Sequence, residues 1–303
     1  CRMTSRGGGV VGFQPRLWTA TKSNQLLEDV TDRMISGSVT LDLDADGSKM
    51  TFEAQLRKSL DVRPLGTFVA PFLELTFGDG SSVMEQCGLF VLVPAPAHHA
   101  PGGTIYELDG RDLCWLLDAN QTPVTVTDGN GSNLIGVAHT AMDSVGYTRR
   151  NIPASTKTHT KANSWPPGTS RLKRINDRLN MASYYTLWFD RHGIATSVPY
   201  FDLATAEPAV TFSDAPGTYV VPPIEEEPDM TRLCNRVVVI GTDPANAQII
   251  STRQNNDPTS PTSWLNIGNP TQSPTQGNWI TRTFEDSTIQ TQEAADAKAE
   301  QLL

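Results

Sequence analysis

Residues 169–200 (TSRLKRINDRLNMASYYTLWFDRHGIATSVPY) constrain the fold of this chain most, because they specify one supersecondary unit. After a Pro-Pro-Gly break and a Thr169-Ser170 N-cap, apolar residues recur at helical spacing: Leu172, Ile175, Leu179 and Ala182. Two short strands, YYTLWFD and IATSVPY, follow around a turn at residues 191–193. The pattern predicts a helix packed on a small hairpin. It contains no nucleophile–base pair, phosphate loop or thiolate cluster, so we interpret it as a packing module.

The first third of the chain alternates apolar and polar residues as β-strands do. The alternation runs from Val39 to Leu43 and resumes from Met50 to Leu56. Three further candidate strands, PFLELTF, GLFVLV and TIYELDG, are separated by the turn GDGSS and by a loop at residues 94–103. Residues 15–110 therefore predict a small β-barrel-like domain, preceded by an N-terminal arm at residues 1–14.

Residues 111–205 combine helices with short strands. RDLCWLLD predicts a short amphipathic helix, and a second helical stripe runs from Leu134 to Val145 and ends at Gly146. With the helix and hairpin of residues 169–200, these elements predict a small α+β domain.

Residues 206–303 return to a β pattern after a Pro-punctuated linker. CNRVVVIG and AQIISTRQ predict paired strands around a turn at residues 243–246, and NWITRTF predicts another strand. A rough helical stripe behind Asp286 and Ser287 predicts a terminal helix over residues 287–303, packed on a second β-barrel-like domain. We expect the natural chain to continue beyond both printed ends. The predicted fold class is β-rich α+β, with two small β-barrel-like domains and an intervening small α+β domain.

Residues 42–53 match the text of an EF-hand calcium loop. The matching residues are Asp42, Asp44, Asp46, Gly47 and Glu53. An EF-hand needs a helix on both sides, whereas the flanks here alternate with a period of two. We therefore predict a β-hairpin with its turn at residues 45–48 and no bound calcium, and a calcium loop is the alternative.

A cluster of carboxylates is the strongest candidate for acid–base chemistry: Glu107, Asp109, Asp112 and Asp118. Paired carboxylates are what a glycosidase or muramidase requires. Asp109 and Asp112 bracket a predicted helix start, where the helix dipole favours acids, so capping is the preferred interpretation.

The cysteines and histidines lack the spacing of a metal site. The four cysteines form no C-x-x-C pair and favour free, buried thiols: Cys1, Cys87, Cys114 and Cys234. The histidines are predicted in loops, on a turn and on the second helix: His98, His99, His139, His159 and His192. We predict no catalytic, cofactor-binding or metal-binding residue, and no cofactor.

The net charge of −9 argues against a general nucleic-acid-binding protein, whose affinity comes from neutralising phosphates. The acidic run at residues 225–229 is typical of a solvated linker, and in a channel it would repel DNA. The basic residues gather in the middle of the chain: Arg149, Arg150, Lys157, Lys161, Arg171, Lys173, Arg174 and Arg178. We interpret them as a solvated helix face, or alternatively as a seam against an acidic neighbouring subunit. No apolar run approaches the roughly 20 residues of a membrane span, so no membrane insertion is expected.

Four stretches, in this order, resemble the minor tail proteins of long-tailed actinobacteriophages and, more broadly, the tail hub family that caps the tail tube. They are ISGSVTLDLDADGSKMTFEAQL, TIYELDGRDLCWLL, YYTLWFD with GIATSVPY, and NRVVVIG through SWLNIG. Together they span most of residues 16–303, and the similarity rests on their order and pattern.

The resemblance implies a structural, non-enzymatic protein that forms a homotrimeric ring at the tail tip of a virion assembled in the host cytoplasm. The implied partners are further copies of the chain, the distal tail protein, the tape-measure protein and other tail-tip proteins, with genomic DNA only as a passing cargo. The alternative is a receptor- or carbohydrate-binding tail-tip module that exposes Trp165, Trp264 and Trp279 in loops. A cell-wall hydrolase finds little support in the sequence.

Overall fold

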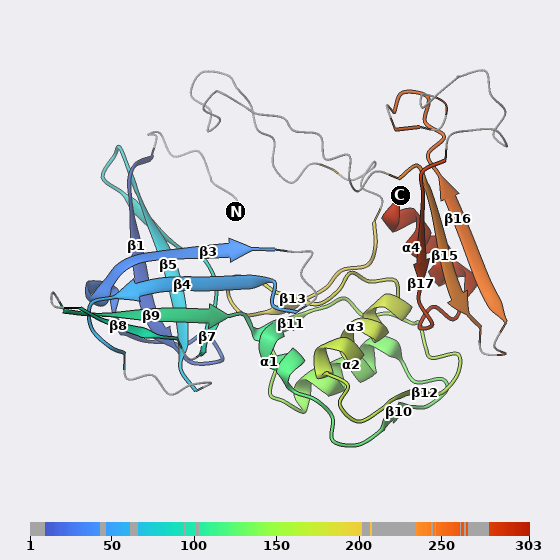
Figure 1. Ribbon diagram of the computed structural model, residues 1–303, viewed down its shortest axis with the longest axis horizontal. Helices are drawn as coiled ribbons and strands as arrows, with labels where there is room; N and C mark the ends of the chain where they lie inside the picture. Colours follow the sequence, from blue (N-terminus) through green and yellow to red (C-terminus); the bar gives the residue numbers. More distant parts are fainter. Residues whose placement is uncertain are drawn as a thin grey trace.

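A computed structural model describes residues 10–42, 47–60, 66–93, 95–100, 103–201, 207, 234–243, 245, 247–260, 262–263, 265 and 279–303. Figure 1 shows three parts in chain order along the long axis: a large sheet, a middle part with three helices, and a small sheet beside the last helix. Most of the predicted N-terminal arm, the centre of the turn at residues 43–46 and the acidic run at residues 225–229 lie outside the described residues.

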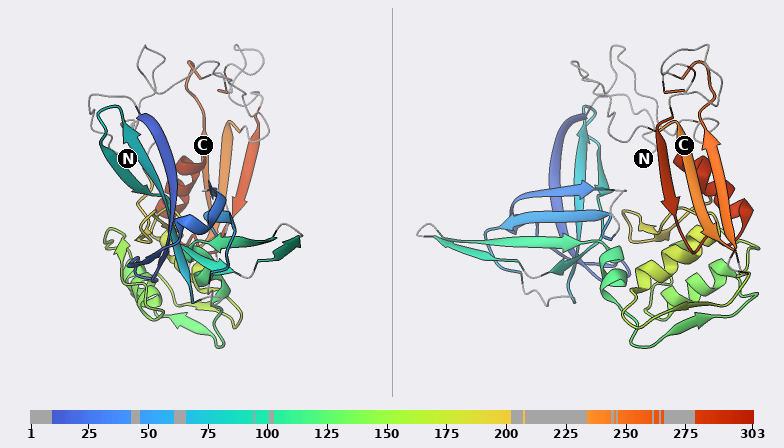
Figure 2. Two further views of the ribbon diagram at one scale, coloured as in Figure 1. Left: turned by 90° about the vertical axis from the view of Figure 1, so that its left-hand side faces the viewer. Right: turned by 45° about the vertical axis from the view of Figure 1, so that its right-hand side comes forward.

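The first sheet contains nine antiparallel strands in the order β2-β1-β5-β7-β9-β4-β3, with β6 beside β5 and β8 beside β9. The strands are β1 (Val10–Ala20), β2 (Leu26–Asp29), β3 (Met34–Leu41), β4 (Met50–Leu56), β5 (Phe68–Phe77), β6 (Ser82–Gln86), β7 (Phe90–Val93), β8 (Ala97–Ala100) and β9 (Gly103–Arg111), with a 3-10 turn at Thr31–Arg33. The strands cross at large angles in Figure 2, so the sheet curls around its own core. Within that core the rings of Phe52 and Phe90 stack 5.6 Å apart.

The predicted hairpin around residues 42–53 is confirmed. Val39 lies opposite Phe52, and Leu41 lies opposite Met50, in the antiparallel pair β3–β4. The predicted loop at residues 94–103 is wrong in its centre, because β8 forms there. β8 pairs with the first half of β9, which extends beyond the residues that pair with β4 and β7.

The middle unit comprises the three helices and the short strands between them. Its elements are α1 (Leu113–Ala119), β10 (Val126–Asp128), α2 (Leu134–Asp143), β11 (Arg150–Asn151), β12 (Asn163–Trp165), α3 (Arg171–Met181), β13 (Trp188–Phe189) and β14 (Ala195–Thr196). The predicted helix and hairpin of residues 169–200 are confirmed: the Ser170 hydroxyl caps α3 by accepting from Lys173 N at 3.1 Å, and β13 pairs with β14. The turn between these strands uses Gly193 at φ +70°, a conformation that favours glycine.

The first sheet and the middle unit share one apolar core. Ala20, Phe68 and Val91 of the sheet belong to the same buried cluster as the apolar faces of α1, α2 and α3. The approach is close at Gly193, where an added Cβ would lie 2.6 Å from Leu89 Cδ2. A side chain at this position would force the Leu89 side chain to shift and would strain the backbone at its positive φ.

The C-terminal unit is a three-stranded sheet covered on one face by a helix, within the residues described there. Its elements are β15 (Arg236–Thr242), β16 (Gln248–Gln254), β17 (Thr281–Glu285) and α4 (Gln292–Leu302). Alanines of α4 pack on the alternate β15 residues Val237 and Val239. α4 begins five residues later than predicted, because Asp286 forms a turn with Thr288 and the Ile289 carbonyl accepts from Thr242 N at 2.9 Å.

Together these elements confirm the β-rich α+β fold class. Among the described residues, no helix is both long and apolar enough to cross a membrane.

Candidate functional site

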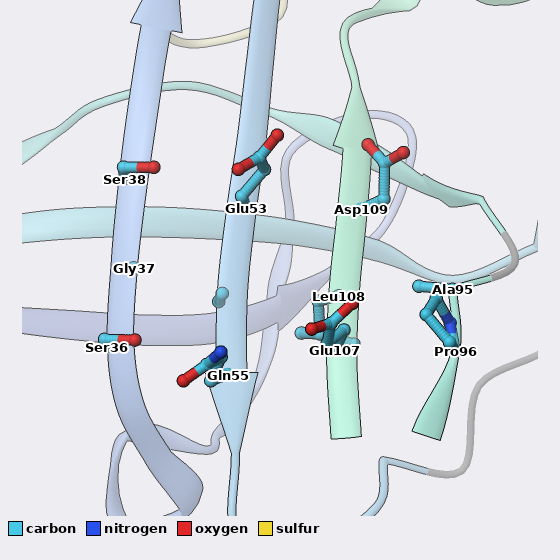
Figure 3. A pocket seen from close by; sticks show the side chains of 11 residues that line it. Ser36, Gly37, Ser38, Glu53, Gln55, Ala95, Pro96, Glu107, Leu108 and Asp109 are labelled. Carbon is cyan, nitrogen blue, oxygen red and sulfur yellow. The ribbon is translucent and has the colours of Figure 1, made fainter. Parts of the chain in front are cut away.

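A polar groove of about 510 Å³ crosses the outer face of β3, β4 and β9 (Figure 3). Its polar side chains come from alternate positions of the three strands: Ser36, Ser38, Glu53, Gln55, Glu107 and Asp109. The strand register places Glu53 opposite Asp109 and Gln55 opposite Glu107, so the side chains form two rows across the sheet. The apolar neighbours Ala54 and Leu108 point into the core on the other face.

Two of the groove's three carboxylates have partners within the chain. Asp109 Oδ2 accepts from Arg111 Nη2 at 2.9 Å, and Glu107 Oε1 lies 3.1 Å from His98 Nε2. The second oxygen of Asp109, Oδ1, is buried without a hydrogen-bond partner. The arrangement can accept hydrogen bonds from a polar or cationic group. Acid catalysis by a carboxyl group calls for an apolar enclosure, which this open polar face does not supply.

The predicted carboxylate cluster is split by the structure. Asp112 is fully buried and caps α1, accepting hydrogen bonds from Cys114 N at 3.0 Å and from Lys49 N at 2.8 Å. Burial raises the pKa of Asp112, although hydrogen bonds from Lys49 N and Met50 N oppose the shift. Capping is therefore confirmed for Asp112, whereas for Asp109 it is wrong, because that residue lies on β9 in the groove. Asp118 is exposed in the last turn of α1.

A buried ionic network in the middle unit has no counterpart in the sequence prediction. Arg178 of α3 donates to Asp128 of β10 from Nε at 2.6 Å and from Nη2 at 3.0 Å, and His159 Nε2 lies 3.1 Å from the same carboxylate. Burial raises the pKa of Asp128, but the hydrogen bonds from His159 and Arg178 outweigh it and hold this pKa at about 2. The Arg178 guanidinium also stacks 4.5 Å from the Trp165 ring centroid. The network fastens β10 and β12 to α3.

The basic side chains predicted to form a solvated face are buried or contact other groups of the same chain. Arg174 and Arg178 are 4% and 2% exposed, so the interpretation of a solvated helix face is wrong for both. The other basic side chains also have partners: Arg149 with the Ser23 carbonyl, Arg150 with Asp143, Lys157 with Glu293, Lys161 with the Asp243 carbonyl, Arg171 with Ser144, and Lys173 with Asp177. Arg150, Lys157 and Lys173 are paired with carboxylates, whereas the partners of Arg149, Lys161 and Arg171 are neutral, so these contacts leave their charge uncompensated.

Of the three tryptophans predicted in exposed loops, the two that the structure describes are not fully exposed. Trp165 is 5% exposed, and its Nε1 donates to Asp177 Oδ2 at 2.8 Å. Trp279 is half-buried with the Arg236 guanidinium 5.0 Å from its ring centroid, and Trp264 lies outside the described residues.

The cysteines of the described part are free thiols, as predicted. Cys114 is buried, and burial raises the pKa of its thiol, while Cys87 and Cys234 are half-buried. Among the described residues, no group of three or more His, Cys, Asp and Glu side chains has the arrangement of a metal site.

An exposed apolar ribbon projects from the first sheet. We define the ribbon as residues 10–15 of β1, residues 73–77 of β5, and β6. The strand register aligns Phe13, Leu75 and Val83 on the face that continues the sheet's inner, core-facing side. Phe13 is 75% exposed. Leu75 and Val83 are half-buried, so the exposed part of this row is its Phe13 end, which is suited to contact with another molecule.

The edge strand β3 is a second exposed surface. Its sequence, MISGSVTL, contains neither charge nor proline, and seven of its eight residues are exposed. Leu41 lies opposite Met50, on the side of the sheet that carries the core, yet it is 60% exposed. Natural proteins usually protect such an edge with charges, bulges or a covering segment. β3 has a register shift between Met34 and Ser36, and beyond it no strand of the described residues covers its outer edge, so this part is open to pairing with another strand.

The fold is similar to that of solved phage tail proteins. The tail protein from Neisseria meningitidis MC58 matches with a TM-score of 0.57 and 12% identity, over 93% of this chain and 73% of that one. The 43 kDa tail protein of prophage MuSo2 from Shewanella oneidensis matches with a TM-score of 0.52 and 9% identity, over 94% and 78% of the chains. Prophage tail protein gp18 from Listeria monocytogenes EGD-e matches with a TM-score of 0.51 and 10% identity, over 95% of this chain and 76% of that one.

The sequence itself matches no family model and no curated protein. At such low identity, the structural likeness establishes a common fold over nearly the whole chain. The chain therefore has the fold of these phage tail proteins.

Proposed function

We propose that this chain is a structural tail hub, or minor tail, protein at the host-facing tip of a bacteriophage tail. The observation that carries the proposal is the likeness to three phage tail proteins over 93%, 94% and 95% of the chain, because a match of this extent includes both sheets and the middle unit. The resemblance of the sequence to actinobacteriophage minor tail proteins supports the finer assignment. In this role the protein is not an enzyme, and its mechanism is to position other components around the DNA channel.

The exposed apolar surfaces support assembly into a ring, for which we propose three copies. A ring forms when two different surfaces of each copy meet in a head-to-tail contact that closes. The ribbon and the edge strand β3 belong to the sheet at one end of the long axis of the molecule, and the C-terminal sheet lies at the other end (Figure 1). We propose that the first sheet of one copy contacts the C-terminal sheet of the next. Each copy would then supply two β-rich units, so three copies would place six such units around the ring. This arrangement would match a threefold tip to a sixfold tail tube.

The proposed division of the chain is an arm at residues 1–14, a first β domain at residues 15–110, an α+β domain at residues 111–205, and a linker with a second β domain at residues 206–303. Separate buried clusters inside the first sheet and inside the C-terminal unit support the first and last of these domains, while the first β domain and the α+β domain also share one cluster.

The proposed partners are other copies of the chain, the distal tail protein, the tape-measure protein and other tail-tip proteins. The net charge of −9 suits a wall that DNA passes without binding. The virion tail tip, after assembly in the host cytoplasm, is the proposed location.

Two measurements test this proposal. Native mass spectrometry of the purified chain should give a mass three times that of the 33.0 kDa monomer. Gold-labelled antibodies against the chain should bind one end of phage tails in electron micrographs. A strictly monomeric chain, together with label on the capsid or along the tail shaft, would contradict the assignment.

A carbohydrate-binding module is the second candidate, and the groove of Figure 3 is the observation that favours it. Hydroxyl, amide and carboxylate groups, such as those of Ser38, Gln55 and Glu53, are the groups that hydrogen-bond sugars. Calorimetry with host cell-wall saccharides tests this candidate. Binding by a monomer that is lost in Glu53→Ala, but retained in a Thr40→Ala control, would favour it over the hub.

A further inference from the structure

The two junctions between the three parts of this chain are built differently. At the junction of the first sheet with the middle unit, one apolar cluster continues from Ala20, Phe68 and Val91 into α1, α2 and α3. Polar contacts surround this cluster, including the ion pair of Arg191 with Glu85 at 2.6 Å. Separating these parts would expose a continuous apolar surface to water, which strongly opposes separation.

The junction of the middle unit with the C-terminal unit has no such shared cluster in the described residues. The buried cluster of the C-terminal unit contains only its own side chains, such as Val237, Ile289 and Ala295. The contacts that cross this junction are polar: Lys157 Nζ to Glu293 Oε1 at 3.2 Å, Thr160 Oγ1 to Gln290 Oε1 at 2.9 Å, and Lys298 Nζ to Tyr200 OH at 3.3 Å.

The packing at the second junction is also incomplete. A small cavity lies between Leu134 and Met181 on one side and Thr288 and Ala294 on the other. His159 also lines it, and its Nδ1 is buried without a hydrogen-bond partner. The cavity, of about 20 Å³, is large enough for one water molecule and is lined mostly by polar side chains, so the two units meet here across a polar surface and not across a packed apolar one.

We propose that the C-terminal unit (β15–β17 and α4) moves as a separate rigid body against the combined body of the first sheet and the middle unit. The polar contacts at the junction act as a latch that opens and recloses. The pair Lys157–Glu293 can be exchanged for hydrogen bonds to water at small net cost, since the Glu293 side chain is 78% exposed, whereas the contacts of Gln290 and Tyr200 are more buried and cost more to open. Interfaces of this kind between parts of one chain permit relative motion.

The motion is proposed for the isolated chain, and this part of the proposal does not depend on a role in a tail. Its use does rest on the proposed function: in a ring, rotation of the C-terminal unit would change the width of the channel without breaking the larger body. The predicted consequence is one stiff junction and one mobile junction in the same molecule.

Distances between pairs of spin labels on the isolated chain, measured by double electron–electron resonance, test the proposal. One pair, Thr40→Cys with Thr140→Cys, spans the first junction, and the other, Thr140→Cys with Glu300→Cys, spans the second. All three positions are exposed. The background carries Cys1→Ala, Cys87→Ala and Cys234→Ala and retains the buried Cys114. We expect a narrow distance distribution for the first pair and a distribution at least twice as wide for the second.

Matched variants then separate the two junctions. Lys157→Ala with Gln290→Ala removes latch contacts and should widen the second distribution further. Arg191→Ala removes a polar contact of the first junction and should leave the first distribution narrow, because the apolar core holds that junction. Distributions of equal width for the two label pairs, unchanged in the latch variant, would overturn the proposal. Since the measurement uses single chains in dilute solution, its result is independent of whether the chain forms a tail ring.

Discussion

Arg178 and Asp128 form a two-point ion pair, in which the guanidinium Nε and Nη2 donate to the two oxygens of one buried carboxylate at 2.6 and 3.0 Å. The two side chains are 2% and 8% exposed, and 50 positions separate them in the chain. The pair therefore ties α3 to β10 where the sequence gives no local reason for a contact.

Removing one member of this pair should destabilise the fold. Arg178→Met leaves the Asp128 carboxylate buried with His159 as its remaining side-chain partner, and a broken buried pair costs about 3–5 kcal/mol. Urea unfolding followed by circular dichroism measures the loss. Lys173→Met is the matched control on the same helix, because the Lys173 side chain is 63% exposed, and it should cost less than about 1 kcal/mol. Equal midpoints for the two variants would contradict a structural role for the pair.

The same pair predicts a dependence of stability on pH. The pKa of Asp128 is lowered to about 2 in the folded chain, whereas the pKa of an aspartate in an unfolded chain is about 3.9. The stability that the ionised Asp128 contributes is therefore fully present above about pH 4, and it is lost as the pH falls from about 4 towards the folded-state pKa of about 2. Thermal unfolding of the natural chain and of Asp128→Asn should show a gap in melting temperature at pH 6 that narrows below pH 4. A gap that stays constant down to pH 2.5 would argue against the ionised pair.

The hairpin of β3 and β4 should not bind calcium specifically. Glu53, the last position of the apparent calcium loop, lies within β4 opposite Asp109. Because its backbone is paired in the sheet, residues 42–53 cannot adopt the twelve-residue loop that an EF-hand folds around calcium. Calorimetric titration should therefore give no saturable heat. A micromolar dissociation constant that disappears in Asp42→Ala would refute the hairpin interpretation.

The chain should not degrade peptidoglycan. Asp112 is occupied as a helix cap, and the groove around Asp109 is open and polar, so neither carboxyl has the apolar enclosure of an acid catalyst. Zymography on actinobacterial cell walls should show no clearing. Clearing that vanishes in Asp109→Asn, while a Glu74→Gln control on the ribbon remains active, would sink the structural assignment.

The apolar face of the ribbon should contribute to self-association. Phe13→Asp places a charge in the row with Leu75 and Val83, and losing one buried aromatic side chain from a contact costs roughly 1.5–3 kcal/mol, or more than tenfold in affinity. Met84→Asp on the opposite face of the same ribbon is the control and should have little effect. Sedimentation velocity over a range of concentrations measures both. An unchanged association constant for Phe13→Asp would exclude this face from the interface.

The elements with strong local signals were predictable from the sequence. Ser170 caps α3, and the alternation through Val39 and Phe52 gave the hairpin, because capping and side-chain alternation act over a few residues. The start of α4 was not predictable in the same way. Residues 286–290 carry helix-compatible side chains, but the pairing of Thr242 N with the Ile289 carbonyl holds them in a turn.

The buried side chains of the middle unit were beyond prediction for a different reason. The sequence places Arg174 and Arg178 four residues apart on one side of α3, which fits a solvated face and a buried one equally well. Burial depended on Asp128, which folding brings to the helix from β10. Likewise, the row of Glu53 and Asp109 in the groove exists only because β4 and β9 are neighbours in the sheet, an order that no periodicity reveals.

The core shared by the first sheet and the middle unit has a consequence for synthesis on the ribosome. Ala20 and Ala195 belong to the same buried cluster, so the face of the sheet that packs on the middle unit is not fully covered until residues near 195 have left the exit tunnel. At about 5–20 residues per second, synthesis from the end of β9 at Arg111 to Ala195 takes roughly 4–17 s, during which a nascent sheet with an uncharged edge at β3 can meet other chains. Until the hairpin around Gly193 arrives, part of the apolar face of the N-terminal third is therefore exposed to water.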